Sequence, residues 1–354
     1  MGVFDDVLKN NETLFKNEIA LDYSFIPKLI PYREKEQHHL ANCMKPVLAG
    51  RNGRNVLIHG PPGIGKTAAC RHLLRELEES DEFSEKVYLF YINCWQKNTT
   101  YKVILDMCDI VGYVFTQNKK GDELFKIIAN IINKKGAIFV FDEIDKAEDT
   151  DFLYMILEDI YKKSIFLITN YKSWLLELDD RIKSRLIPEL LEFRQYNENE
   201  TSGILRERIQ YAFIDNIWND DALSVVVKKA FELKDIRSGL FLIKESALVA
   251  EEKGSRKIKK EHVNIALLKL DEFVIKSSLD LDEESQKIFK IIKENSGQKI
   301  GDLFKLYQKS GGVQSYKSFQ RKIAKLDEGK YISLEKTHGS GGNTTIINKK
   351  ITDY

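Results

Sequence analysis

The segment from Val56 to Thr67 constrains the fold of this chain most strongly. A short apolar run, Val56 to Ile58, leads into a loop rich in glycine and proline that ends in Lys66-Thr67, and a helix-forming run follows. The loop matches G-x4-G-K-T, and strand, loop and helix in this order are the context in which that pattern binds a triphosphate. A glycine-rich turn that matches by chance is the alternative, and the flanking strand and helix argue against it. The pattern predicts a P-loop in an α/β fold.

Each residue type in the loop has a chemical reason. Backbone N–H groups of a glycine-rich turn and of the following helix terminus form an anion-binding nest. Lys66 can reach the β- and γ-phosphates, and the Thr67 hydroxyl is a ligand for Mg²⁺. ATP or ADP with Mg²⁺ is therefore the predicted cofactor. The predicted phosphate-binding positions are Gly63, Ile64, Gly65, Lys66, Thr67 and Ala68.

Two further strand ends carry candidate catalytic groups. The apolar run Ile138 to Phe141 ends in Asp142-Glu143, and the run Ile165 to Ile168 is followed by Asn170. Beside a P-loop, Asp142 is suited to hold Mg²⁺ and Glu143 to act as general base on the attacking water. Asn170 can orient that water. The alternatives are two solvated acids at an ordinary strand end and an ordinary turn asparagine.

Buried apolar runs at 87–92, 137–141 and 165–168, with 190–193 as a further candidate, alternate with helical patterns. This alternation predicts a parallel sheet covered by helices on both faces. Ligands of such sheets bind beyond the carboxyl ends of the strands, where the P-loop, Asp142-Glu143 and Asn170 all lie.

The rest of the chain changes character after this sheet. Four amphipathic helices are predicted at 200–212, 221–231, 238–252 and 260–274, and then a linker at 277–282. Three short helices at 286–294, 300–308 and 315–326, followed by β-like runs at 331–336 and 344–348, predict a winged helix. The expected domains are a P-loop ATPase base at 1–194, a helical lid at 195–275 and a winged-helix domain at 276–354.

Charge is distributed unevenly along the chain. The net charge is +1, but residues 285–354 hold 14 lysines and arginines against six acids, which leaves about −7 on the remainder. A basic module joined to an acidic remainder is typical of phosphate-backbone binding. A winged helix that binds a protein partner is the alternative. The predicted DNA-binding residues on the third short helix are Gln314, Ser315, Lys317, Gln320, Arg321, Lys322 and Lys325.

Other functional classes find little support. The four cysteines form no C-x2-C pair, which favours free thiols in a reducing cytosol over a disulfide framework or a zinc site. His38-His39 lies in a polar helical stretch and is expected to be a solvated face. The acidic N-terminus lacks the basic region of a signal peptide, and no apolar run is long enough to span a membrane. We expect a cytoplasmic protein without a membrane partner.

Arginines add candidates for stabilising phosphate charge. Arg181 and Arg185 are four residues apart, hence on one helix face, and Arg237 opens a helix of the second domain. An arginine finger offered to the γ-phosphate of a neighbouring subunit would explain the pair. A solvated basic helix face is the alternative.

Taken together, these motifs resemble AAA+ ATPases and, more narrowly, the archaeal replication initiators of the origin recognition complex subunit 1 / cell division control protein 6 family. The resemblance runs from about Pro31 to Asn348. It rests on Ile30-Pro31-Tyr32-Arg33-Glu34, the P-loop, Ile92-Asn93-Cys94, Asp142-Glu143-Ile144-Asp145, Arg181-x-Lys183-Ser184-Arg185, Gln195-Tyr196-Asn197, the run from Ile204 to Arg208, and Asp235-Ile236-Arg237.

The resemblance implies roles that spacing alone does not. It implies that such a protein binds duplex origin DNA, self-associates on it, and helps load the minichromosome maintenance helicase, with slow ATP hydrolysis as a switch. The rivals are a regulatory or transposition-helper ATPase whose winged helix binds protein, and a clamp-loader subunit. The implied site roles are Tyr32 and Arg33 near the adenine, Tyr196 and Arg208 lining the nucleotide site, Asn170 and Arg237 as sensors, and Arg185 as the finger with Arg181 in support.

Some residues depart from the family pattern. Asp180 stands where proline is common, and Ile64 stands where threonine is common, a change that leaves the backbone nest intact. The wing from His338 to Thr345 has no arginine, which puts a minor-groove contact of the wing in doubt. The segment from Val111 to Asp122 is the candidate for the initiator-specific insertion.

Overall fold

The computed structural model describes residues 13–279, 282–295, 297–328, 332–339 and 342–349. They form two compact units. The sheet unit comprises Asn17–Ala212 with Lys234–Leu240. The helical unit comprises Phe213–Leu233 and the described residues from Phe241 on, joined by residues 13–16.

The sheet unit is built on five strands in the order β2-β3-β4-β1-β5. All neighbouring pairs are parallel, which confirms the predicted parallel sheet. This order places the loop after β1 beside the end of β4. The strands are β1 (Val56–His59), β2 (Val87–Asn93), β3 (Gly136–Asp142), β4 (Lys163–Thr169) and β5 (Glu189–Glu192).

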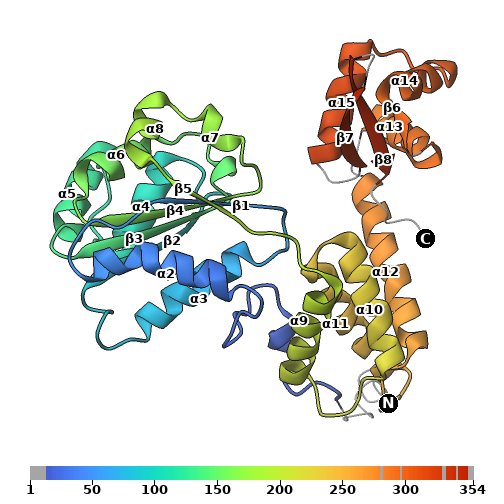
Figure 1. Cartoon of the computed structure of the whole chain (residues 1–354), viewed down its shortest axis with the longest axis horizontal. Coiled ribbons are helices and arrows are strands. Elements are labelled where there is room, and N and C mark those ends of the chain that lie inside the picture. The colour runs from blue at the N-terminus through green and yellow to red at the C-terminus, as the bar shows by residue number, and fades with distance from the viewer. Residues whose placement is uncertain (1–12, 280–281, 296, 329–331, 340–341, 350–354) are drawn as a thin grey trace. The chain divides into compact units, whose positions relative to one another are not determined.

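Helices cover both faces of this sheet (Figure 1). Helices α2 (Glu34–Leu48) and α3 (Lys66–Glu78) pack on one face, where their apolar residues share a core with Val56, Ile138 and Phe166. The other face is covered by a second set of helices, whose apolar residues form a separate core with the sheet. That set is α4 (Thr100–Ile110), α5 (Gly121–Ile132), α6 (Asp151–Asp159), α7 (Trp174–Glu177) and α8 (Asp180–Leu186).

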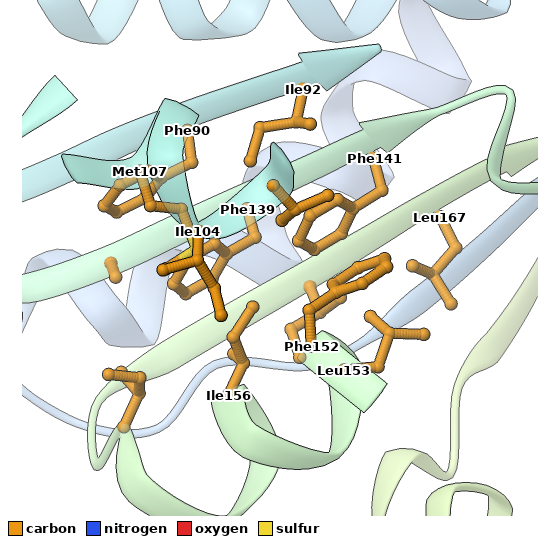
Figure 2. Packing of buried hydrophobic residues seen from close by; sticks show 14 of the residues in the cluster. Phe90, Ile92, Ile104, Met107, Phe139, Phe141, Phe152, Leu153, Ile156 and Leu167 are labelled. Atoms are coloured by element: carbon orange, nitrogen blue, oxygen red, sulfur yellow. The ribbon is translucent and has the colours of Figure 1, made fainter. Parts of the chain in front are cut away.

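Phenylalanine rings pack among aliphatic side chains in the second core (Figure 2). The rings of Phe90 and Phe139 stack with centroids 4.6 Å apart, and Phe141 packs against Phe152 of α6 at 4.8 Å. All four side chains are fully buried. Such stacking adds to the stabilisation from apolar burial and fixes β3, whose last residue is Asp142.

A capping box opens helix α9 (Glu198–Ala212) of the sheet unit. The Asn197 side chain accepts a hydrogen bond from the Glu200 amide at 2.9 Å, and the Glu200 carboxylate accepts one from the Asn197 amide at 2.9 Å. Arg194 donates to both Glu200 oxygens. Two short 3-10 helices, Glu18–Leu21 and Ile144–Lys146, complete the unit.

The helical unit contains α10 (Asp220–Leu233), most of α11 (Ile236–Glu252) and α12 (Lys260–Leu279). The predicted linker from residue 277 is wrong at its start, because α12 continues to Leu279. Three helices and a β-hairpin follow, as predicted for a winged helix, and a short strand that was not predicted, β6, adds to the hairpin in the antiparallel order β6-β8-β7. They are α13 (Glu283–Glu294), β6 (Gln298–Lys299), α14 (Ile300–Lys309), α15 (Tyr316–Glu328), β7 (Ile332–Gly339) and β8 (Gly342–Lys349).

All four cysteines are buried free thiols, as predicted. Across the described part of the chain, every helix is too short or too polar to cross a membrane. The centre of the predicted wing, residues 340–341, lies outside the described residues.

Candidate functional site

The loop between β1 and α3 depends on its glycines. Gly60, Gly63 and Gly65 have φ of 145°, 75° and 88°, in the left-handed region that disfavours side chains. Space is closed as well. A Cβ on Gly63 would lie 2.1 Å from an Asp235 oxygen, and one on Gly65 would lie 2.8 Å from the Tyr196 hydroxyl. Neighbouring segments therefore approach the loop closely enough to define its shape.

Lys66 is held at the mouth of this loop. It opens α3 and is only 7% exposed. Its ammonium donates to the carbonyls of Gly60 and Pro61 at 2.7 Å each and to the Asn170 amide oxygen at 3.0 Å. The structure thus brings together the predicted lysine and the predicted asparagine from the ends of β1 and β4.

Asp142 sits at the centre of a second cluster. Its Oδ2 accepts hydrogen bonds from Thr67 Oγ1 at 2.8 Å and from the Tyr91 hydroxyl at 2.7 Å, and Oδ1 accepts from the Glu143 amide at 3.0 Å. The carboxylate is 3% exposed. Oxygen-only donors such as Thr67 and Asp142 are the ligand type that Mg²⁺ prefers, so the residues present fit this ion.

Glu143 follows in a strained backbone conformation. Its φ of 53° places it in the left-handed region, which is uncommon for a non-glycine residue. Burial, and then the negative charges of Asp142 and Asp145, raise the pKa of Glu143 above its usual range. A higher pKa makes its carboxylate a stronger proton acceptor, as a general base requires.

Arg33 supports the loop through hydrogen bonds from its buried guanidinium, and we call this support a brace. The side chain is fully buried, and its guanidinium donates to the Ile64 carbonyl at 3.2 and 3.1 Å, to the Arg194 carbonyl at 2.5 Å and to Glu36 at 3.0 Å. It also lies 4.0 Å from the ring centroid of Tyr196. All of these hydrogen bonds from the guanidinium go to protein atoms. Tyr196, which contacts the guanidinium, also lies close to Gly65 of the loop.

Tyr32 and Arg208 hold neighbouring segments. The Tyr32 hydroxyl packs so closely against Gly203 of α9 that a Cβ there would lie 2.1 Å from it. Arg208 donates to the carbonyls of Ala20 and Phe25 at 2.9 and 3.1 Å, and burial lowers the pKa of its guanidinium. These contacts anchor the N-terminal segment to α9, and direct contact of either residue with a nucleotide stays a prediction.

Arg237 is linked to the loop by the Asp235 side chain. Its guanidinium donates to the Asp235 carboxylate at 3.0 and 2.9 Å, and the same carboxylate faces Gly63. The Ile236 amide approaches the Gly63 carbonyl at 3.5 Å. The first turn of α11 is therefore attached to the phosphate-binding loop, and a sensor role for Arg237 stays a prediction.

Arg185 has a different environment. Its guanidinium pairs with Glu158 of α6 and lies 5.0 Å from the ring centroid of Tyr154, and its side chain is 42% exposed. Arg181 pairs with Asp179 at 3.1 Å and is 74% exposed. The partners of both arginines in the structure are acids near α8 rather than residues of the loop.

Helix α15 presents the predicted DNA-binding residues. Phe319, Ile323 and Leu326 are buried, so one face packs on the core of the helical unit. Three of the predicted residues have partners: Lys322 pairs with Asp282 at 2.6 Å, and Gln314 and Ser315 accept hydrogen bonds from the Ser318 hydroxyl and amide. Five are exposed, namely Ser315, Lys317, Gln320, Arg321 and Lys325.

Comparison with known proteins identifies the family. Residues 30–166 match the family model of the AAA ATPase domain, and residues 202–267 match that of the Cdc6 AAA+ ATPase-type lid domain. The ORC1-type DNA replication protein 1 of Archaeoglobus fulgidus is 30% identical over 344 residues, which span 92% of this chain and 84% of that protein. This chain belongs to the ORC1-type family of DNA replication initiators.

Further relatives agree with this assignment. The ORC1-type DNA replication protein 2 of Methanosarcina mazei is 29% identical over 98% of this chain and 96% of its own. Two Aeropyrum pernix structures share the fold. ORC1 in complex with DNA has a TM-score of 0.70 at 24% identity, covering 95% of this chain and 94% of that one. ORC2, in ADPNP-ADP complexes, has a TM-score of 0.71 at 16% identity, with the same coverage.

The structure of this ORC1-type protein adds residues that the sequence patterns did not single out. Tyr91 was expected only as part of a buried strand, and its hydroxyl in that apolar run was the available signal for a polar partner. Asp235 pairs with Arg237, and Glu158 pairs with Arg185. Asp145, whose carboxylate forms an ion pair with Lys146 at 3.3 Å, lies near enough to Glu143 to raise its pKa.

Proposed function

We propose that this protein is an ATP-switched initiator that binds duplex origin DNA through α15 and helps recruit the replicative minichromosome maintenance helicase. One observation carries the proposal: a chain of the ORC1-type family joins a P-loop site assembled from three strand ends to a basic module whose third helix exposes polar and cationic side chains. The helicase partner and self-association on DNA rest on the family alone.

In the nucleotide site, each residue has a separate task. Lys66 would exchange its bond to Asn170 for the β- and γ-phosphates, and Thr67 with Asp142 would hold Mg²⁺, which neutralises phosphate charge. Glu143 would accept the proton of the attacking water, while Asn170 keeps that water in line. Slow turnover suits a switch, because the bound nucleotide then persists long enough to control assembly.

Arg185 would act on a neighbouring copy. Among the described residues, Arg185 forms an ion pair with Glu158, and both side chains are about half exposed, so a γ-phosphate from another copy could replace that acid. Guanidinium groups stabilise the charge that develops during phosphoryl transfer. This arrangement makes hydrolysis depend on assembly.

For DNA, α15 would enter the major groove. Lys317, Arg321 and Lys325 supply charge for phosphates, and Ser315 with Gln320 offers hydrogen-bonding groups to base edges. Ser315 also caps the helix, since its hydroxyl accepts from the Ser318 amide at 3.3 Å. Polar contacts at the start of a recognition helix are the usual way to read sequence.

Substitution of α15 in the full chain tests the DNA-binding part. The double variant Lys317→Ala/Arg321→Ala should weaken duplex binding and reduce the slope of log affinity against log salt by about two, one unit for each lost phosphate contact. Lys305→Ala is the matched control, since this exposed lysine of α14 already pairs with Asp302 at 3.2 Å. Unchanged affinity and slope in the double variant would show that α15 does not contact the DNA phosphates, whereas no duplex binding by the unsubstituted chain would favour a basic module that binds a protein partner.

A further inference from the structure

A second cluster of ligand atoms lies at the amino-terminal end of strand β5. His39 and Cys43 are four residues apart on α2 and therefore share one helix face, and Glu189 is the first residue of β5. Their ligand atoms all lie within 4.8 Å of one another. None of the three belongs to the nucleotide site, which is built at the carboxyl ends of the strands.

The distances in this cluster fit a small metal ion. His39 Nε2 is 3.1 Å from Glu189 Oε2 and 3.8 Å from Cys43 Sγ, and Cys43 Sγ is 3.9 Å from Glu189 Oε2. For tetrahedral zinc with ordinary bond lengths, the same pairs are expected about 3.3, 3.6 and 3.5 Å apart. Shifts of a few tenths of an ångström would bring the three ligand atoms to the spacing expected around zinc.

Surrounding contacts fix two of the three ligands. The other oxygen of Glu189 accepts a hydrogen bond from Arg54 at 3.1 Å, which leaves Oε2 directed at His39 and Cys43. The Cys43 carbonyl accepts from the Arg54 amide at 3.1 Å and from the Ser164 hydroxyl at 3.4 Å. Outer contacts of this kind orient ligands in metal sites and strengthen binding.

We propose that His39, Cys43 and Glu189 form a binding site for a zinc-class divalent cation. Thiolate, imidazole and carboxylate are all ligands of Zn²⁺, and a thiolate disfavours Mg²⁺ and Ca²⁺. The His39 and Glu189 side chains are 39% and 35% exposed, so water can reach the cluster and supply the fourth ligand. The ion would join α2 to the edge strand β5.

This location relates the ion to the nucleotide loop. Helix α2 begins directly after Arg33, which holds Ile64 of the loop. Strand β5 leads directly into the segment of Arg194 and Tyr196, which contact the same guanidinium. An ion that fixes α2 to β5 would therefore restrict the motion of Arg33 and of the segment that contacts its guanidinium.

Metal titration of the full-length protein tests the proposal. Calorimetry with Zn²⁺ should be done in excess Mg²⁺, which occupies oxygen-only sites, and Co²⁺ should serve as a spectroscopic probe of thiolate ligation. We expect one ion per chain and a thiolate-to-cobalt charge-transfer band. Glu189→Gln should weaken Zn²⁺ binding by about 100-fold or more, and Cys43→Ser should remove the band.

Two controls make the outcome decisive. Cys108→Ser removes another buried thiol, and His38→Gln removes the neighbouring exposed histidine, so both should bind like wild type. Glu189 is partly exposed, so Glu189→Gln should fold even if Cys43→Ser does not. Absence of tight binding, a missing charge-transfer band, or binding unaffected by Glu189→Gln would overturn the proposal.

Discussion

Replacement of Arg33 by methionine tests whether this residue braces the loop or contacts the nucleotide. The side chain is fully buried, and its loss would leave the Ile64 and Arg194 carbonyls without their donor. Removing one member of a buried charged network costs about 3–5 kcal/mol, and the contact with Tyr196 is part of that sum. For a unit of this size, such a loss lowers the melting temperature by roughly 6 to 20 °C.

The assay needs a signal from the sheet unit alone. Trp95 and Trp174 belong to this unit, whereas Trp218 belongs to the helical unit. In a Trp218→Phe background, tryptophan fluorescence therefore follows melting of the sheet unit. Arg51→Met, which removes an exposed arginine, is the matched control and should melt like its parent.

The result has two clear readings. A large loss of stability without nucleotide, together with weaker ADP binding, is expected if Arg33 supports the loop. Wild-type melting without nucleotide, combined with weakened ADP binding, would refute the brace and favour direct contact with the nucleotide.

Three further substitutions test separate parts of the site. Glu143→Gln should keep ATP binding but lower phosphate release by about 10²- to 10⁴-fold, and hydrolysis at the wild-type rate would exclude the general-base role. Because the pKa of Glu143 is raised, wild-type hydrolysis should decline with falling pH at higher pH than an ordinary glutamate would allow. Arg185→Ala should slow hydrolysis by about 10³-fold only at concentrations where copies associate; an equal loss at every dilution would argue against a finger in trans. Arg194 lowers the pKa of Glu200 from 4.5 to about 2, so in urea unfolding the stability advantage of wild type over Glu200→Gln should be complete above pH 4.5 and disappear as pH falls toward 2. A constant advantage across that range would show that the ion pair does not stabilise the fold.

Much of the sheet unit follows from local sequence patterns. The run at 137–141 has no polar residue, which is typical of a strand buried on both faces, and β3 confirms this prediction. The pattern G-x4-G-K-T also fixed the loop and the start of α3. Because parallel strands end at one edge of a sheet, the P-loop could be expected to meet Asp142 and Asn170, and the hydrogen bonds from Thr67 to Asp142 and from Lys66 to Asn170 confirm this.

Pairs that are distant in sequence could not be predicted in this way. The contact of His39 and Cys43 with Glu189 joins positions about 150 residues apart. Periodicity gives only the helical spacing of His39 and Cys43, and His38-His39 was expected to be a solvated face. The contacts of Arg33 are similar: the resemblance implied a place near the adenine, which stays a prediction, and no pattern marks the Ile64 and Arg194 carbonyls to which its guanidinium donates. Charges paired across the fold, such as Arg185 with Glu158, depend on tertiary packing in the same way.

Duplex-DNA binding by the full chain tests the central claim most directly. Fluorescence anisotropy should compare DNA from upstream of the protein's own gene with shuffled DNA of equal composition, in ATP and in ADP, across a salt series. We predict salt-sensitive binding that prefers the upstream DNA, with an affinity that differs between the two nucleotides in wild type but not in Lys66→Ala. Equal binding to both DNAs in both nucleotides would contradict the account of an ATP-switched initiator.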